Sequence, residues 1–151
     1  GQGQNTNITW IRPVCRGGRA RGGSVSGGAY VHFQDVDIEG TEYAGIYIAN
    51  ETIAYDTEPT DHVTVTGGKV TNCATGNNGH PSILFFQDTG GSVDTCSILN
   101  VDIYDQAGDG AYFIEGRGGQ TNCSATNVTV FSTPRSALVA GGVTATNVVY
   151  G

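Results

Sequence analysis

The 151-residue sequence lacks methionine, contains a single tryptophan, and has only one lysine, Lys69. It also lacks any apolar run of about 18 residues, so we expect no membrane-spanning helix. Positive charge is scarce, and the formal net charge of −7 argues against nucleic acid as a partner. The same charge argues mildly against strongly anionic polymers such as polyuronates.

The four cysteines include no pair at CxxC spacing, which argues against a zinc site of that type. Their redox state stays open, because a disulfide that uses Cys15 or Cys73 is compatible with the sequence. No secretion signal is visible, and the chain starts at Gly1 without a methionine. We therefore expect one domain, residues 1–151, excised from a larger protein.

Glycine is abundant instead, with 24 residues, and one short pattern returns throughout the chain. Asn or Asp is followed by a β-branched residue and, two positions later, by an apolar residue. The first position of this pattern is taken by Asn7, Asp35, Gly67, Asn100, Asn127 and Asn147. The spacings of 28, 32, 33, 27 and 20 residues are typical of solenoid repeats.

Apolar residues alternate with polar ones on both sides of this position, which predicts strands with one buried face. Another alternating strand follows in each unit, with inward pairs at Ile46 and Ile48, Ile83 and Phe85, Ala111 and Phe113, and Ala137 and Val139. Stacking of like positions predicts three parallel sheets around a narrow core that includes Cys96 and Cys123. At the bend between strands, Asn and Asp tolerate unusual backbone angles, and stacked Asn amides can form a hydrogen-bonded ladder.

The Asn/Asp positions, the NVxI-type strands and the GIYI-type strand resemble the right-handed parallel β-helix family, which has the pectate-lyase-like fold. The resemblance covers nearly the whole chain and implies an all-β solenoid of about six short coils. It implies a fold rather than an activity, because lyases, hydrolases, epimerases, phage spikes and binding modules share it. It also implies a carbohydrate groove on the sheet that contains residues 46–48 and their equivalents.

The catalytic sets of this family are missing from the sequence. Polygalacturonase-like members carry adjacent aspartates, Gly-His-Gly and Arg-x-Lys, and pectate-lyase-like members place an Arg or Lys base near acidic calcium ligands. Neither set is present, since Lys69 stands alone and four of the arginines lie in the first 21 residues. His32, His62 and His80 are scattered, and we interpret them as surface residues.

Two acidic loops leave alternatives open. One contains Asp105 and Asp109, and the other contains Asp56, Glu58 and Asp61. Paired carboxylates can hydrolyse a glycoside, and they can also bind calcium through their oxygens. Asp and Gly are also the usual residues of solvated turns, and this is the interpretation we favour for both loops. The sequence therefore predicts no cofactor, with calcium as the alternative.

The expected outward residues of the groove sheet form a stripe along the solenoid axis, namely Tyr47, Leu84, Tyr112 and Leu138. Tyrosine rings beside amides and carboxylates suit a sugar, because the ring stacks on its C–H face and the polar groups bond its hydroxyls. The predicted carbohydrate-binding residues are Tyr43, Tyr47, Asn50, Phe86, Gln87, Asp105, Asp109, Tyr112, Glu115 and Arg117, with His80 and Arg135 in the same loops. The reserve candidate is a second face with Asp37, Glu39, Lys69, Asp102, Tyr104 and Phe131.

We expect a non-catalytic carbohydrate-binding module that recognises a neutral plant polysaccharide, with xylan as the expected glycan. It resembles the xylan-binding modules built on a β-helix, which implies a secreted or cell-surface monomer within a multidomain enzyme such as a xylanase. Two alternatives stay open. One is a catalytic fragment of a polysaccharide lyase or glycoside hydrolase, and the other is a structural piece of a phage or adhesin spike, which would form trimers.

Overall fold

The computed structural model describes residues 5–51, 59–88 and 91–151. These residues form strands, turns and loops only, which confirms the all-β class. Their strands pair in parallel within two sheets, one of ten strands and one of five. No helix among the described residues is long and apolar enough to cross a membrane.

The large sheet contains β1 (Asn5–Ile11), β2 (Val14–Gly18), β4 (Gly28–Thr41), β6 (Thr60–Asp61), β7 (Thr64–Thr71), β9 (Val93–Asp94), β10 (Ser97–Leu99), β11 (Asp102–Tyr104), β13 (Ser124–Phe131) and β15 (Thr144–Tyr150). The small sheet contains β3 (Gly23–Ser26), β5 (Ile46–Asn50), β8 (Ile83–Gln87), β12 (Tyr112–Arg117) and β14 (Ala137–Ala140).

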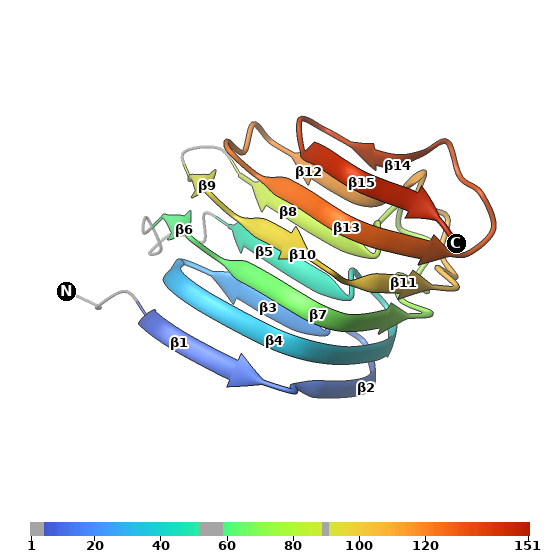
Figure 1. Cartoon of the computed structure of the whole chain (residues 1–151), viewed down its shortest axis with the longest axis horizontal. Helices are drawn as coiled ribbons and strands as arrows, with labels where there is room; N and C mark the ends of the chain where they lie inside the picture. The colour runs from blue at the N-terminus through green and yellow to red at the C-terminus, as the bar shows by residue number, and fades with distance from the viewer. Residues whose placement is uncertain (1–4, 52–58, 89–90) are drawn as a thin grey trace.

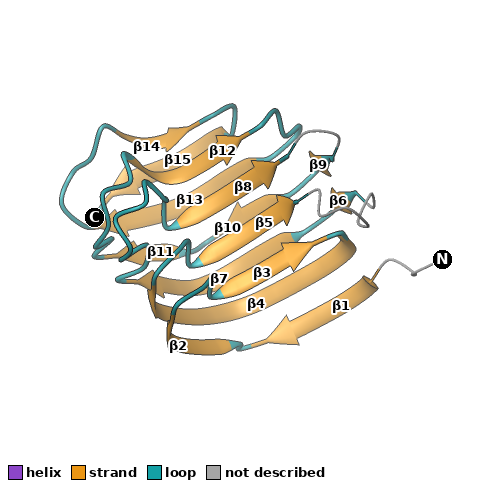
Figure 2. Ribbon diagram, turned by 180° about the vertical axis from the view of Figure 1, so that it is seen from behind, coloured by secondary structure: helices purple, strands orange, loops and turns teal. Residues whose placement is uncertain are grey.

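The chain passes alternately through the two sheets, from β1 and β2 to β3, then from β4 to β5, and so on to β15. We call one passage through the large sheet and the next strand of the small sheet a repeat. Each repeat lies beside the previous one, so the strands of the small sheet stack in the order β3, β5, β8, β12, β14 (Figures 1 and 2). The first repeat lies at one end of the stack and β15 at the other.

The sequence predicts three sheets, and the structure has two, because the strands on either side of the Asn/Asp position belong to one hydrogen-bonded sheet. β4, β7, β13 and β15 run through that position without a break. The backbone bends there through left-handed residues, with φ of 53° at Asp35, 54° at Asn100 and 52° at Asn127. The predicted bend is therefore confirmed, although it does not separate two sheets.

The predicted Asn ladder forms over three repeats. The side-chain amide of Asn127 donates to Asn100 Oδ1 at 3.1 Å, and that of Asn147 donates to Asn127 Oδ1 at 2.9 Å. The ladder does not continue to the second and third repeats, where the Asp35 carboxylate lies next to Gly67, which has no side chain.

The register of the first repeat differs from the prediction. Trp10 pairs with Phe33, and Val14 pairs with Asp37, so the residue opposite Asp35 is Arg12, with φ of 53°. Asn7 belongs instead to a second column of left-handed residues that continues through Tyr30, His62, Thr95 and Asn122. The sequence pattern was misleading here because Arg occupies the bend and an Asn five residues earlier mimics it.

The core lies between the two sheets. Its largest fully buried side chains include Phe85, Phe113, Ile48 and Ile83, and the inward Cys96 and Cys123 pack among them as predicted. All four cysteines are free thiols.

The register of β12 also differs from the prediction. Ile114 pairs with Ile83, and Glu115 pairs with Leu84, so Glu115 takes the outward place that was predicted for Tyr112. Phe113 and Ile114 are both fully buried, which hides the alternation that the prediction used. Gly116 lies opposite Phe85, and the side chain of Gln120 fills the space that a Cβ at Gly116 would need.

Candidate functional site

The predicted Tyr47–Tyr112 stripe is not an open surface. Tyr47 and Leu84 point away from the main core, yet they are only 3% and 1% exposed. With Ala44, Ala49 and Phe86 they form a second apolar cluster on the outer side of the small sheet. Tyr112 does not lie beside Leu84 in the sheet. Glu115 pairs with Leu84, and Tyr112 pairs with Ala137.

The ring of Tyr47 is covered by a side chain from the first repeat. The Arg21 guanidinium carbon lies 3.7 Å from the ring centroid, and Arg21 is paired with Glu51 at 2.5 Å. The Tyr47 hydroxyl donates to the same Glu51 carboxylate at 2.6 Å. Burial and this hydrogen bond raise the pKa of Tyr47 above its ordinary value. Because a cation already occupies the ring face, Tyr47 cannot stack on a sugar in this arrangement.

Two other predicted residues, Asn50 and Gln87, contact the segment that leads into β9. Asn50 is buried against Gly91, where a Cβ would overlap its Oδ1. Gln87 accepts a hydrogen bond from the Val93 amide at 3.3 Å. Asp105 is an exposed residue of a bend, with φ of 46°. The side chains of Asn50 and Gln87 therefore support this segment rather than a binding surface.

Other predicted residues do come together, in the loops that precede the strands of the small sheet. Tyr43 lies edge-on to His80, with ring centroids 5.1 Å apart. The Asp109 carboxylate accepts a hydrogen bond from the Gly79 amide at 2.7 Å. Arg135 donates to the Gly110 carbonyl at 2.8 Å. These contacts join four successive repeats, and we call Tyr43, His80, Asp109 and Arg135 the loop row.

Glu115 and Arg117 lie beside this row. They form an ion pair at 2.7 Å, which raises the pKa of Arg117, and Arg117 also donates to the Gly79 carbonyl at 2.5 Å. The carbonyl and the amide of Gly79 are therefore held by Arg117 and Asp109 respectively. This fixes the position of the loop that carries His80.

A pocket of about 510 Å³ opens at the end of the loop row. Its lining residues are Asp109, Gly110, Ala111, Thr133, Pro134, Arg135 and Ser136. Thr133 and Ser136 were missed from the sequence, although the polar stretch STPRS follows β13 at the place where Asp109 precedes β12. A comparison of equivalent loops between repeats would have found them.

The polar groups of this pocket are held in place by the protein itself. Arg135 donates to the carbonyl of Gln106 at 2.6 Å as well as to that of Gly110, and it lies near the Phe113 ring. The buried Gln106 in turn accepts from the Ser82 amide at 2.8 Å and donates to the Tyr112 carbonyl at 3.1 Å. The loop before β12 is thus fixed before any ligand arrives.

His80 should make stability depend on pH. Burial, Arg117 and Arg21 lower its pKa below the ordinary value of 6.5, because they disfavour the charged imidazolium. The unfolded chain therefore binds more protons than the folded chain below about pH 6.5, and stability falls as pH decreases through that value. We expect His80→Gln to flatten the dependence of the urea midpoint on pH between about pH 7 and 5. An unchanged slope in the variant would contradict this assignment.

The reserve face is assembled as the sequence predicts. Asp37, Lys69 and Asp102 lie side by side on neighbouring strands, and Tyr104 pairs with Phe131. Arg16 pairs with Asp37 and lowers the pKa of that carboxyl group, and Lys69 lies 3.7 Å from it. The rings of Tyr104 and Phe131 are stacked, with centroids 4.8 Å apart. On this face the Asp37 carboxylate is therefore neutralised by Arg16 and Lys69, and one stacked aromatic pair lies beside these charges.

Asp56 and Glu58 of the second acidic loop lie outside the described residues. Among the residues that the structure does describe, no group of three or more His, Cys, Asp or Glu side chains could hold a metal ion. Comparisons of the chain with protein-family models, with curated proteins and with solved structures found no match.

Proposed function

We propose that the chain is a right-handed parallel β-helix that acts as a non-catalytic carbohydrate-binding module for a neutral plant polysaccharide, with xylan as the expected glycan. The parallel pairing of every repeat with its neighbours supports this fold. The observation that carries the function is the loop row with its pocket of about 510 Å³, because its polar side chains are held in position without a ligand.

The chemistry of the loop row suits a neutral sugar. The pocket combines the Asp109 carboxylate, the Arg135 guanidinium and the hydroxyls of Thr133 and Ser136, so it offers donors and acceptors without a large excess of one charge. The row spans three strand spacings from Tyr43 to Arg135, roughly 14 Å. An extended glycan that lies along the row could therefore contact Tyr43, His80 and the pocket together.

We propose binding rather than hydrolysis because of the number of carboxylates that line the pocket. A glycosidase needs two carboxylates that flank one sugar bond. Among the described residues that line the pocket, Asp109 supplies one carboxylate, and Asp105 lies outside the lining. The proposed setting is a secreted or cell-surface enzyme, in which this module would bring catalytic domains to the polysaccharide.

The test is titration calorimetry with xylo-oligosaccharides on the parent, on Asp109→Asn and on the matched control Asp105→Asn. Asn at 109 can still accept from the Gly79 amide, so the loop should stay folded, but the charge-assisted bond to the sugar is lost. We expect Asp109→Asn to weaken binding about fivefold and Asp105→Asn to bind within about twofold of the parent. Circular dichroism checks that both variants are folded.

Two results would count against the proposal. If the parent binds no neutral glycan, the function is rejected. If Asp109→Asn binds as well as the parent, the site moves to the face with Tyr104 and Phe131, whose stacked rings make it the second candidate. The same samples are assayed for reducing ends and unsaturated products, and we expect neither. Turnover that Asp109→Asn abolishes would establish an enzyme instead.

A further inference from the structure

Cys96 and Cys123 lie side by side in the core, on neighbouring strands of the large sheet. The residues that follow them, Ser97 and Ser124, are paired partners in β10 and β13. In three other repeats the same inward column is occupied by Val31, Val63 and Val143. Neighbouring strands lie about 4.8 Å apart, and a disulfide joins Cα atoms that are about 4.4–6.8 Å apart. The two cysteines are therefore spaced as a disulfide requires.

The backbone holds the two cysteines level with each other on both sides. Before them, Asp94 and Thr121 form a β-bridge. The Asp94 carboxylate also accepts hydrogen bonds from the Thr121 hydroxyl at 2.6 Å and from the Asn122 side-chain amide at 2.9 Å. At the cysteines themselves, the Ser124 amide donates to the Cys96 carbonyl at 3.0 Å. These bonds fix the register, so the two thiols stay opposite each other.

Both cysteine side chains follow the same path into the core. The residue before each cysteine is left-handed, with φ of 52° at Thr95 and 51° at Asn122. Each thiol donates to the backbone carbonyl two residues earlier, at 3.1 Å from Cys96 and at 3.4 Å from Cys123. The contact between the two thiols raises the pKa of Cys96 and lowers that of Cys123. The sulfur atoms thus meet each other inside the same apolar cluster.

The other two cysteines are placed differently. Cys15 pairs with Ile38 of β4, and β4 lies between it and β7, which Cys73 follows in the sequence. Two strand spacings, about 9.6 Å, exceed the reach of a disulfide. Cys96 is level with Val63, which precedes β7, so the length of that strand separates Cys96 from Cys73. The disulfide with Cys15 or Cys73 that the sequence left open is therefore disfavoured.

We propose that Cys96 and Cys123 form an intramolecular disulfide when the chain folds in oxidising surroundings. The two S–H bonds break and one S–S bond forms. Two electrons and two protons pass to a small external disulfide such as oxidised glutathione, which becomes two thiols. The new bond ties β10 to β13 and closes the loop 96–123, which contains β12 and Asp109 of the loop row. The inference does not depend on the glycan that the module binds.

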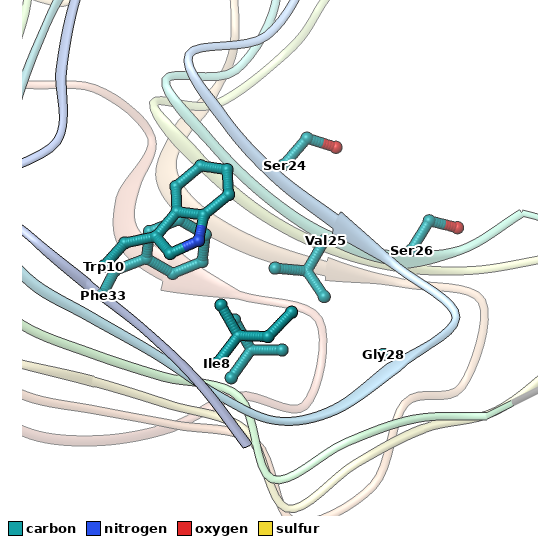
Figure 3. Close-up of a pocket in the computed structure, with 8 residues that line it drawn as sticks. Ile8, Trp10, Ser24, Val25, Ser26, Gly28 and Phe33 are labelled. Atoms are coloured by element: carbon teal, nitrogen blue, oxygen red, sulfur yellow. The ribbon is translucent and has the colours of Figure 1, made fainter. Parts of the chain in front are cut away.

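The exchange takes place before the core closes, because Cys96 and Cys123 are only 0% and 1% exposed. The core is open at the first repeat, where Figure 3 shows Trp10, Val25 and Phe33 around a pocket of about 140 Å³. Within the column, however, Val63 lies between that end and Cys96. An external disulfide therefore reaches the thiols in the unfolded chain, and the finished bond is shielded from reductants.

The test is a peptide map of the chain after refolding from urea, once with reduced and oxidised glutathione and once with dithiothreitol. Remaining thiols are alkylated before digestion with trypsin, which cleaves after Lys69, Arg117 and Arg135. We expect the glutathione sample to contain peptides 70–117 and 118–135 joined by a bond that dithiothreitol cleaves. Fragment spectra should place this bond at Cys96, with Cys73 alkylated. Four alkylated thiols, or a bond that uses Cys15 or Cys73, would overturn the proposal.

The bond should also be visible in stability. Closing the loop 96–123 restricts the unfolded chain, so we expect the oxidised parent to unfold roughly 5–10 °C above the reduced parent. Cys96→Ala should remove this difference. The matched control Cys73→Ala also truncates a fully buried cysteine and should keep it.

Each variant is compared with itself in the oxidised and reduced states, so a general loss of stability from the substitution cancels. The peptide map of the parent needs no variant and decides the question even where Cys96→Ala does not fold. Equal unfolding temperatures for the oxidised and reduced parent would contradict a bond that fits the native register. A difference that survives Cys96→Ala would assign the bond to other cysteines and overturn the proposal as well.

Discussion

Replacing Gly68 by Ala is expected to lower the free energy of unfolding by about 3–5 kcal/mol. Gly68 has φ of 97°, a backbone conformation that residues with a side chain rarely adopt. A Cβ built there would overlap the backbone nitrogen and oxygen of Val36 and would lie 2.8 Å from the carbonyl carbon of Asp35. Since these are backbone atoms of the paired strand β4, they cannot move aside without breaking the register between β4 and β7.

Gly119→Ala is the matched control for this variant. Gly119 has nearly the same φ, 95°, but nothing lies within 4 Å of a Cβ built on it. The control therefore carries the backbone strain without the clash, and we expect it to cost about 1–2 kcal/mol. Urea unfolding followed by circular dichroism measures both. Equal losses in the two variants would show that β4 and β7 can separate locally at little cost.

The inward face of the large sheet could be predicted from the sequence because its signals are local. Val31, Phe33, Val63 and Val65 alternate with polar residues, and all four are buried. The bends at Asn100, Asn127 and Asn147 could be predicted because Asn is one of the few residues that adopts the left-handed conformation easily. In these places the residue types of one short segment are sufficient to predict which side chains are buried and where the backbone bends.

The covering of the predicted groove could not be predicted, since it depends on contacts between repeats. Tyr47 alternates like any outward strand residue, and nothing in its own segment shows that Arg21 will lie on its ring. In β12, likewise, the space beside Gly116 is filled by the side chain of Gln120 from the following loop, a contact that the strand's own alternation does not show. Such long-range contacts override the local alternation.

The loop row was predicted only in part for a similar reason. Tyr43 and Asp109 were chosen because loops beside this sheet usually bind carbohydrate in the family that the sequence resembles. Thr133 and Ser136 follow β13 in the sequence. They line the pocket beside Arg135, which donates hydrogen bonds to the carbonyls of Gln106 and Gly110. The sequence shows a polar loop there, and only the fold shows which loop it meets.

Asn127→Leu is expected to lower the free energy of unfolding by about 2–5 kcal/mol. Asn127 has φ of 52°, where a leucine side chain is strained by roughly 1–2 kcal/mol. It is also the middle residue of the ladder, so the substitution removes the bonds to both Asn100 and Asn147. Each is a net contribution of about 0.5–1.5 kcal/mol. The two losses should add, because one arises in the backbone and the other in the side chains.

Asn77→Leu separates these two causes. Asn77 has φ of 48° and is exposed in the loop before β8, where no ladder forms, so leucine there carries the backbone strain alone. Asn127→Gly does the reverse, since glycine removes the ladder bonds but accepts the left-handed conformation without strain. We expect Asn127→Leu to lose about as much stability as Asn77→Leu and Asn127→Gly lose together. If Asn127→Gly melts at the parent temperature, the ladder contributes nothing to stability, and Asn is present at the bend for its backbone conformation alone.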